Sequence, residues 1–219
     1  MKLKQTIKYC LIVLIILFEL IAFILQIQRA ISSGFFFVSS LVLITYFTNQ
    51  SNLLVTVSTV FSIKKQHKKW YEILYLISLI NIVITASLFH IFLRSYFNPF
   101  ELLQMILHTI VPILFMLYFM FYLKESLPLK KIYLVLIYPL IYFASVYLIF
   151  KPIFGELIST YYPDSPNMPY IYPFFNPANF DHGFIGVFTL MILVIMPIAL
   201  LLTLILMKLK LYLNQKIKA

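Results

Sequence analysis

A threonine and a histidine, in two separate apolar stretches, have the types and spacing for nucleophilic chemistry. Thr48 opens a run of five polar residues, 48–52, inside a long apolar stretch. His108 lies in a second such stretch, at helical spacing from Gln104 and Glu101. A threonine hydroxyl becomes an effective nucleophile when a base takes its proton, and histidine suits that task near neutral pH. The pair predicts an acyl-transfer site with Thr48 as nucleophile and His108 as base.

Other polar residues in the apolar stretches are candidates for supporting roles. The side-chain amides of Gln50 and Asn52 could stabilise a developing oxyanion. Either Gln104 or Glu101 could orient the imidazole of His108. Glu19 lies in the middle of the first apolar stretch, where a carboxyl group is either a functional group or a structural hydrogen-bonding group, and both interpretations stay open.

Some of the polar residues around Thr48 lie on one face of a helix, but the run 48–52 as a whole does not. A stripe on one helix face contains Thr45, Thr48, Asn52, Thr56 and Thr59. We interpret Thr45, Thr56 and Thr59 as hydrogen-bonding contacts between helices. Five successive polar residues, however, point in every direction around a helix, which predicts a cavity or an irregular turn there. In the second stretch, Pro112 removes the hydrogen bond to the carbonyl of His108 and is expected to open the helix at that point.

The elements that carry these residues are expected to be membrane spans. The 219-residue chain is 63% hydrophobic and 11% charged, whereas soluble domains have about 25% charged residues. Crossing the hydrocarbon core takes roughly 20 apolar residues as a helix. We predict an all-α polytopic membrane protein, a single domain over 1–219, with six transmembrane helices at about 9–27, 42–63, 73–93, 102–122, 132–150 and 184–207.

The basic residues indicate how this bundle is oriented. Arg29, Arg94 and Lys151 fall on one side of the predicted spans, and all the other Lys and Arg residues fall on the opposite side. Lys and Arg concentrate in cytoplasmic loops, so we expect a multi-pass protein of the cell membrane with both termini cytoplasmic. The net charge of +10 is then an orientation signal that also attracts anionic lipids, and no nucleic-acid partner is expected.

The connection 151–183 should face outward and cover the bundle. It contains six prolines, which disfavour a regular helix, at positions 152, 163, 166, 169, 173 and 177. Between them lie aromatic residues of the kind that favour the membrane interface: Tyr161, Tyr162, Tyr170, Tyr172, Phe174 and Phe175. We predict an ordered cap over the outer mouth of the bundle.

Three short motifs resemble a known membrane protein family. YFTNQSNLLV (46–55), HTIVPIL (108–114) and YPF (172–174) are similar to the androgen-induced-gene family, and more so to its small bacterial six-helix relatives. The resemblance covers the order and spacing of spans two to six. It implies a threonine hydrolase of fatty acid esters, in which Thr48 is the nucleophile and His108 the base. Animal members often carry Asn-His-Gly-Met before the histidine, whereas this chain has QMIL at 104–107.

Other functions remain open at this point. A haem protein could use His90 and His108 as axial ligands, and a transporter could use the polar stripe, although no inverted repeat is found. A non-catalytic membrane protein is the third alternative. The single cysteine, Cys10, excludes a disulfide scaffold, and the four glycines form no phosphate-binding loop. We expect neither cofactor nor metal. The expected partners are membrane lipids, including a lipid-ester substrate.

Overall fold

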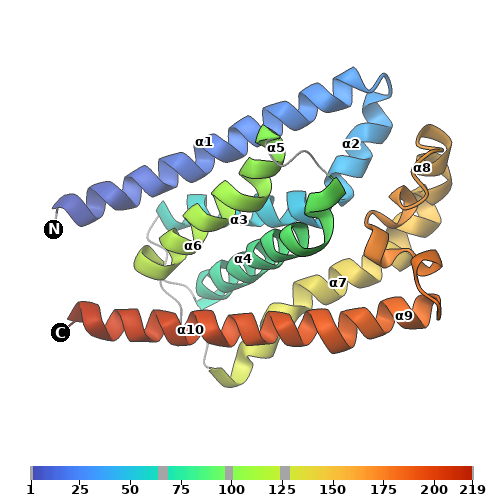
Figure 1. Ribbon diagram of the computed structural model, residues 1–219. Coiled ribbons are helices and arrows are strands. Elements are labelled where there is room, and N and C mark those ends of the chain that lie inside the picture. Colours follow the sequence, from blue (N-terminus) through green and yellow to red (C-terminus); the bar gives the residue numbers. More distant parts are fainter. Residues whose placement is uncertain (1, 64–68, 97–100, 124–128, 219) are drawn as a thin grey trace.

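The computed structural model describes residues 2–63, 69–96, 101–123 and 129–218, and all regular elements within them are helical (Figure 1). Five helical segments of this part of the chain are long and apolar enough to cross a membrane: Leu3–Ser32, Trp70–Leu93, Leu102–Tyr122, Ile132–Tyr161 and Phe184–Gln215. The all-α, membrane-type fold is therefore confirmed. Six spans and the orientation of the termini remain predictions.

The bounds of the elements show that several spans are composite helices. In chain order the elements are α1 (Lys2–Ser32), α2 (Phe36–Thr45), α3 (Phe47–Ile63), α4 (Lys69–Leu88), η1 (Phe89–Leu93), η2 (Arg94–Tyr96), α5 (Leu102–Met105), η3 (Ile106–Ile110), α6 (Val111–Tyr122), η4 (Leu129–Leu136), α7 (Ile137–Ser145), η5 (Val146–Phe154), α8 (Gly155–Tyr161), η6 (Met168–Tyr170), η7 (Pro173–Phe175), η8 (Pro177–Asn179), α9 (Phe184–Thr189), η9 (Leu190–Ile195) and α10 (Met196–Lys218). Of these, η1, η3, η5 and η9 are π-helical and the other η elements are 3₁₀-helical.

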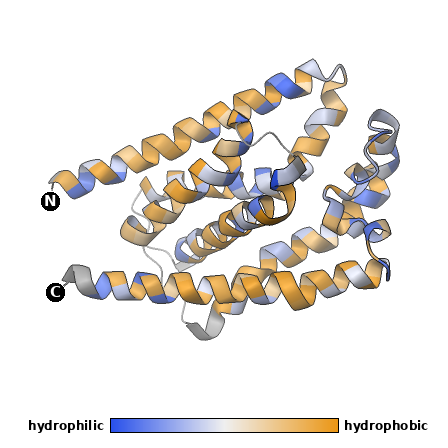
Figure 2. Cartoon of the chain, viewed as in Figure 1, coloured by the Kyte–Doolittle hydropathy of each residue, from blue (hydrophilic) through white to orange (hydrophobic). Residues whose placement is uncertain are grey.

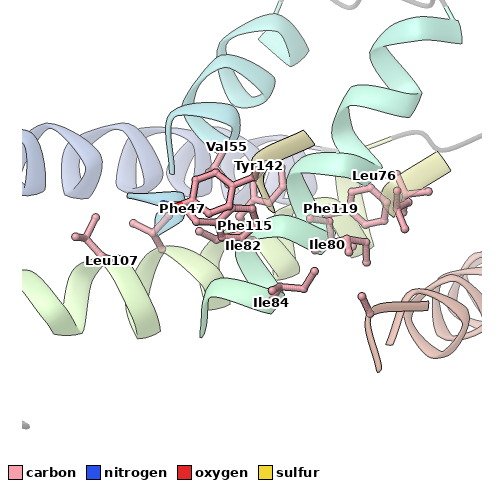
Figure 3. Packing of buried hydrophobic residues seen from close by; sticks show 14 of the residues in the cluster. Phe47, Val55, Leu76, Ile80, Ile82, Ile84, Leu107, Phe115, Phe119 and Tyr142 are labelled. Carbon is pink, nitrogen blue, oxygen red and sulfur yellow. Dashed lines mark hydrogen bonds between the residues drawn. The ribbon is translucent and has the colours of Figure 1, made fainter. Parts of the chain in front are cut away.

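The bundle is arranged around α3, α4 and α6. Figure 1 shows α1 and α10 along opposite sides of these helices, with both chain termini at the same end. Figure 2 shows α1 and α10 as hydrophobic over most of their lengths. The buried core joins most of the long helices, and Figure 3 shows Phe47 and Tyr142 packed together within it, with ring centroids 4.9 Å apart.

The predicted continuous helix 42–63 is wrong, because the chain breaks at Tyr46. Its backbone is extended, with φ −64° and ψ 128°, and it separates α2 from α3. The irregular turn expected from the polar run is thus confirmed, but it lies two residues before Thr48. Helix α2 also begins earlier than the predicted span, at Phe36.

Side chains satisfy the backbone carbonyls that the break exposes. The last four carbonyls of a helix have no partner within it, and four side chains donate to those of α2. Thr45 Oγ1 donates to the carbonyl of Val42 at 2.7 Å, and Asn49 Nδ2 donates to that of Leu43 at 2.6 Å. Gln50 Nε2 donates to the carbonyl of Ile44 at 3.0 Å, and the Tyr142 hydroxyl donates to that of Thr45 at 2.8 Å. Much of the polar run therefore caps the helix that precedes it.

Two tyrosine hydroxyls accept hydrogen bonds from the backbone N–H groups at the start of α3, on the other side of the break. The backbone N–H of Phe47 donates to Tyr142 at 3.1 Å, and that of Thr48 donates to Tyr172 at 3.3 Å. The hydroxyl of Tyr142 thus accepts from α3 and donates to α2, so that one buried side chain spans the break.

We expect Tyr142→Phe to destabilise the protein. The change leaves the carbonyl of Thr45 and the N–H of Phe47 without partners, and each such buried group costs about 1–3 kcal/mol. Thermal unfolding of the purified protein in one detergent measures the effect. Tyr133→Phe is the matched control, because Tyr133 is 58% exposed. Equal melting temperatures for the two variants would contradict the bridging role.

Proline explains most of the π-helical turns. Pro152 lies inside η5, and Pro112 and Pro197 occupy the second position of the α-helix that follows η3 and η9, respectively. A proline cannot donate the i→i−4 bond, and the wider π turn accommodates its ring. The local opening predicted at His108 is therefore present as the π turn 106–110.

The irregular part of the cap is shorter than predicted. Residues 151–161 continue the preceding helix through η5 and α8, so the irregular segment begins after Tyr161. Pro152 does not end the helix because it sits in the π turn. From Tyr162 to Gly183, short 3₁₀ turns place Tyr172 and Phe175 against the bundle, where both are buried.

Lys210, one of the basic residues on the predicted cytoplasmic side, is part of the bundle. Lys210 of α10 is 2% exposed, and its ammonium group donates to the carbonyls of Phe119, Met120 and Leu123 at the end of α6. A cation at a helix C-terminus satisfies free carbonyls and opposes the helix dipole. Lys210 therefore ties α10 to α6.

Candidate functional site

Thr48 and His108 lie at the junction of two adjoining cavities. The first, the apolar cavity, has a volume of about 40 Å³ and is lined by residues such as Ile84, Leu88, Met191 and Ile195. The second, the polar cavity, has a volume of about 250 Å³ and is lined by residues that include Gln26, Arg29, Asn49 and Gln104. Five residues line both cavities: Thr48, Phe89, Leu93, His108 and Tyr172. The structure thus brings together the two side chains that the sequence singles out.

The position of Thr48 follows from the break at Tyr46. Thr48 is the second residue of α3, so it sits at a helix N-terminus inside the bundle. Its hydroxyl Oγ1 and its backbone N both lie 3.3 Å from the hydroxyl of Tyr172. Backbone N–H groups at a helix N-terminus favour negative charge. The candidate nucleophile is therefore beside groups that can stabilise an oxyanion.

The imidazole of His108 is buried, and one of its ring nitrogens is available. The side chain is 6% exposed and stacks on Phe89, with ring centroids 3.9 Å apart and planes 5° from parallel. Its Nδ1 is buried without a hydrogen-bond partner. No hydrogen bond joins Thr48 to His108 among those of the described residues. A group bound at the junction of the two cavities would lie beside both.

Asn52 connects the backbones that carry the two residues. Its Nδ2 donates to the carbonyl of Thr48 at 2.8 Å and to that of Leu107, next to His108, at 3.5 Å. Because these bonds occupy the amide N–H groups, the structure gives Asn52 a positioning role at the junction rather than a direct contact with an oxyanion. The side chain is 2% exposed and its Oδ1 has no partner.

The remaining predicted residues lie in different places. Gln104 lines the polar cavity together with Thr48 and His108. Glu101 pairs with Arg29, which links the start of α5 to the end of α1. Gln50 lies away from the junction, because it caps Ile44 and accepts from Tyr138 at 2.6 Å. Glu19 lines a third cavity, which neither Thr48 nor His108 lines.

Two site residues were not singled out individually by the sequence. Tyr172 contacts Thr48, and Phe89 covers one face of His108. The only signals were the YPF motif for Tyr172 and the position of Phe89 beside His90. Burial raises the pKa of Tyr172 to about 12, so its hydroxyl remains protonated at neutral pH.

The geometry does not favour a pair of axial histidines. His90 Nε2 lies 3.1 Å from Thr109 Oγ1, and His90 lines neither cavity that His108 lines. Phe89 stacks on the ring of His108. In the part of the chain that the structure describes, no three His, Cys, Asp or Glu side chains gather as a metal site.

Comparison of the whole chain with protein-family models, with curated proteins and with solved structures finds no match. A role for the protein must therefore be argued from the site itself.

Proposed function

We propose that the protein hydrolyses lipid esters inside the membrane, with Thr48 as nucleophile and His108 as general base. One observation carries the proposal. A threonine hydroxyl at a helix N-terminus and a buried imidazole with a free ring nitrogen line the same junction, between an apolar and a polar cavity. The resemblance of the motifs around Thr48, His108 and Tyr172 to the androgen-induced-gene family supports the same assignment.

The two cavities suit the two halves of an ester. The apolar cavity, with a volume of about 40 Å³, would hold only the part of the acyl chain next to the ester carbonyl, and the rest of the chain would lie outside it. The alcohol portion would face the polar cavity with its amide, hydroxyl and guanidinium groups. The ester carbonyl would then lie at the junction, beside Thr48 Oγ1. Lipid esters partition into membranes, and a site within a bundle of apolar helices can receive them there.

The chemistry follows from these positions. His108 takes the proton of Thr48 Oγ1 as that oxygen attacks the ester carbonyl. The oxyanion accepts a hydrogen bond from the hydroxyl of Tyr172, which lies 3.3 Å from Thr48 Oγ1. The C–O bond of the alcohol breaks, and His108 returns the proton to the leaving alkoxide. His108 then takes a proton from a water molecule that attacks the acyl-threonine. The bond between the acyl carbon and Thr48 Oγ1 breaks, His108 returns the proton to Oγ1, and the fatty acid is released.

A lipophilic fluorophosphonate tests the proposal directly. The purified protein should be labelled covalently, and peptide mass spectrometry should place the label on Thr48. Label at another residue would show that Thr48 is not the nucleophile. No label at concentrations that label a known lipid hydrolase in the same detergent would leave a non-catalytic membrane role as the better assignment.

Tyr172 provides a separate test of oxyanion stabilisation. We expect Tyr172→Phe to lower kcat by about 10²-fold, the loss typical of one oxyanion donor. Since the pKa of Tyr172 is about 12, the ratio of wild-type to variant activity should stay constant from pH 6 to pH 10. Tyr170→Phe is the matched control, because Tyr170 belongs to the same cap but lines neither cavity. A ratio that falls steadily across this pH range would contradict the assignment.

The membrane orientation belongs to the same proposal. We place six spans across the cell membrane, with α2 and α3 together making the second crossing and both termini in the cytoplasm. The cap and the junction of the cavities would then lie near the extracytoplasmic surface. The charge distribution supports this arrangement.

A further inference from the structure

A third cavity lies on the side of the bundle, between α1, α2 and α3. Its volume is about 500 Å³, and neither Thr48 nor His108 lines it. At its rim Leu20, Phe23, Ile44 and Leu53 are 53%, 60%, 69% and 63% exposed. Exposed apolar side chains on a membrane-embedded bundle face lipid chains. This lateral cavity is therefore open toward the acyl region of the membrane.

The floor of the lateral cavity is polar and incompletely satisfied. Three residues that line it each have a buried side-chain oxygen without a hydrogen-bond partner: Glu19 Oε1, Ser40 Oγ and Asn52 Oδ1. They come from α1, α2 and α3, respectively. Each orphaned buried polar atom requires an explanation, and three of those in the described residues belong to this one cavity, where the polar head of a ligand would satisfy them.

The atoms left available are mainly acceptors. The side-chain N–H groups of Asn49, Gln50 and Asn52 donate to backbone carbonyls. A fourth amide, that of Gln26, donates to Asn49 Oδ1 at 2.8 Å. Among the residues that the structure describes, no Lys or Arg lines the lateral cavity. What remains for a ligand is the carboxyl oxygen of Glu19, the amide oxygen of Asn52 and the adaptable hydroxyl of Ser40.

From these contacts we propose that the lateral cavity is a binding site for an amphiphile whose head group donates hydrogen bonds, a long-chain alcohol or a protonated amine. The head group reaches Glu19 and Asn52, and the chain leaves through the apolar rim into the membrane. An anionic head group is disfavoured because it would meet a carboxyl group and find no cation.

This site is separate from the proposed catalytic site but adjoins it. The lateral and polar cavities share Gln26, Leu43, Asn49 and Leu107, and the hydrogen bond from Gln26 to Asn49 lies in the wall between them. Binding in the lateral cavity requires no contact with Thr48. The two proposals can therefore fail independently.

Photocrosslinking tests the lateral site. The full chain in phosphatidylcholine nanodiscs is irradiated with a long-chain alcohol that carries a diazirine near its hydroxyl, and in parallel with the methyl ether of the same probe. We expect the alcohol to crosslink to peptides of α1 and α3 that line the lateral cavity, and the ether to crosslink at least about tenfold less. Unlabelled long-chain primary amine should compete with the alcohol, but its trimethylammonium analogue, which has no N–H, should not.

Single substitutions test which side chains of the lateral cavity bind the head group of the probe. Glu19→Leu should reduce crosslinking about tenfold, the loss of one hydrogen bond of about 1.4 kcal/mol. Ser40→Ala, a smaller change, should reduce it less and keeps the test valid if Glu19→Leu unfolds. Glu156→Leu, on the exposed face of α8, and Thr48→Ala should leave crosslinking unchanged. Equal crosslinking by alcohol and ether, competition by the trimethylammonium analogue, or unchanged crosslinking in both Glu19→Leu and Ser40→Ala would overturn the proposal.

Discussion

Replacing Thr48 with alanine is expected to lower the hydrolysis of long-chain esters by at least about 10⁴-fold, to the background rate, because the proposed acyl-threonine cannot form without this hydroxyl. The fold should tolerate the change. The bond between the backbone N–H of Thr48 and Tyr172 does not involve the side chain, and Thr48 is only partly buried. The measurement is release of fatty acid from a chromogenic long-chain ester by purified protein, together with the melting temperature of each variant.

Two matched variants serve as controls for the loss of the Thr48 hydroxyl. Thr48→Ser keeps a hydroxyl at the same position and should retain measurable activity. Thr56→Ala removes a hydroxyl two turns along the same helix, where it only bonds to the carbonyl of Asn52, and should leave the rate within a few-fold. If Thr48→Ala remains active while correctly folded, the nucleophile is a different residue and the acyl-threonine mechanism is wrong.

Replacing His108 with glutamine should lower kcat by about 10²–10⁴-fold, the usual contribution of a general base. The KM should change much less, since the cavities that would hold the substrate keep their apolar lining. Labelling of Thr48 by the fluorophosphonate should slow by a similar factor, because the hydroxyl is no longer activated. Together these results would separate activation of Thr48 from binding of the substrate.

His90→Gln is the control for this second prediction. His90 is the neighbouring histidine, but it contacts Thr109 and lines neither the apolar nor the polar cavity. Its replacement should leave kcat within a few-fold of the wild-type value. A comparable loss in the two variants would point to a structural effect of the histidines rather than to a base at His108.

Local sequence patterns are enough to predict several features of the molecule. The apolar composition and the length of the stretches predict membrane helices, because a helix satisfies its own backbone and its length is set by the lipid. The polar run after Tyr46 indicates an irregular turn, and Pro112 indicates an opening at His108. Each of these features depends on residues within about one or two helical turns of it.

Other features depend on residues that are distant in sequence, and these the sequence could not place. Tyr142 and Tyr172 stabilise the break between α2 and α3 from 95 and 124 positions away, and nothing in the apolar pattern marks their hydroxyls as partners of Phe47 and Thr48. Lys210, which looked like a terminal charge, is buried because α10 extends alongside α6 and the free carbonyls there accept its hydrogen bonds.

The different roles of residues 48–52 also depend on residues that are distant in sequence. Five adjacent polar residues look equivalent in sequence, yet Asn49 and Gln50 cap α2, Asn52 ties α3 to the carbonyl before His108, and Thr48 lines the junction of two cavities. Their roles differ because the break turns α3 away from α2, so each side chain meets a different neighbour. Helical spacing predicts that polar groups gather at this depth, but only the packing of α1, α2, α3 and η3 determines which carbonyl or cavity each one faces.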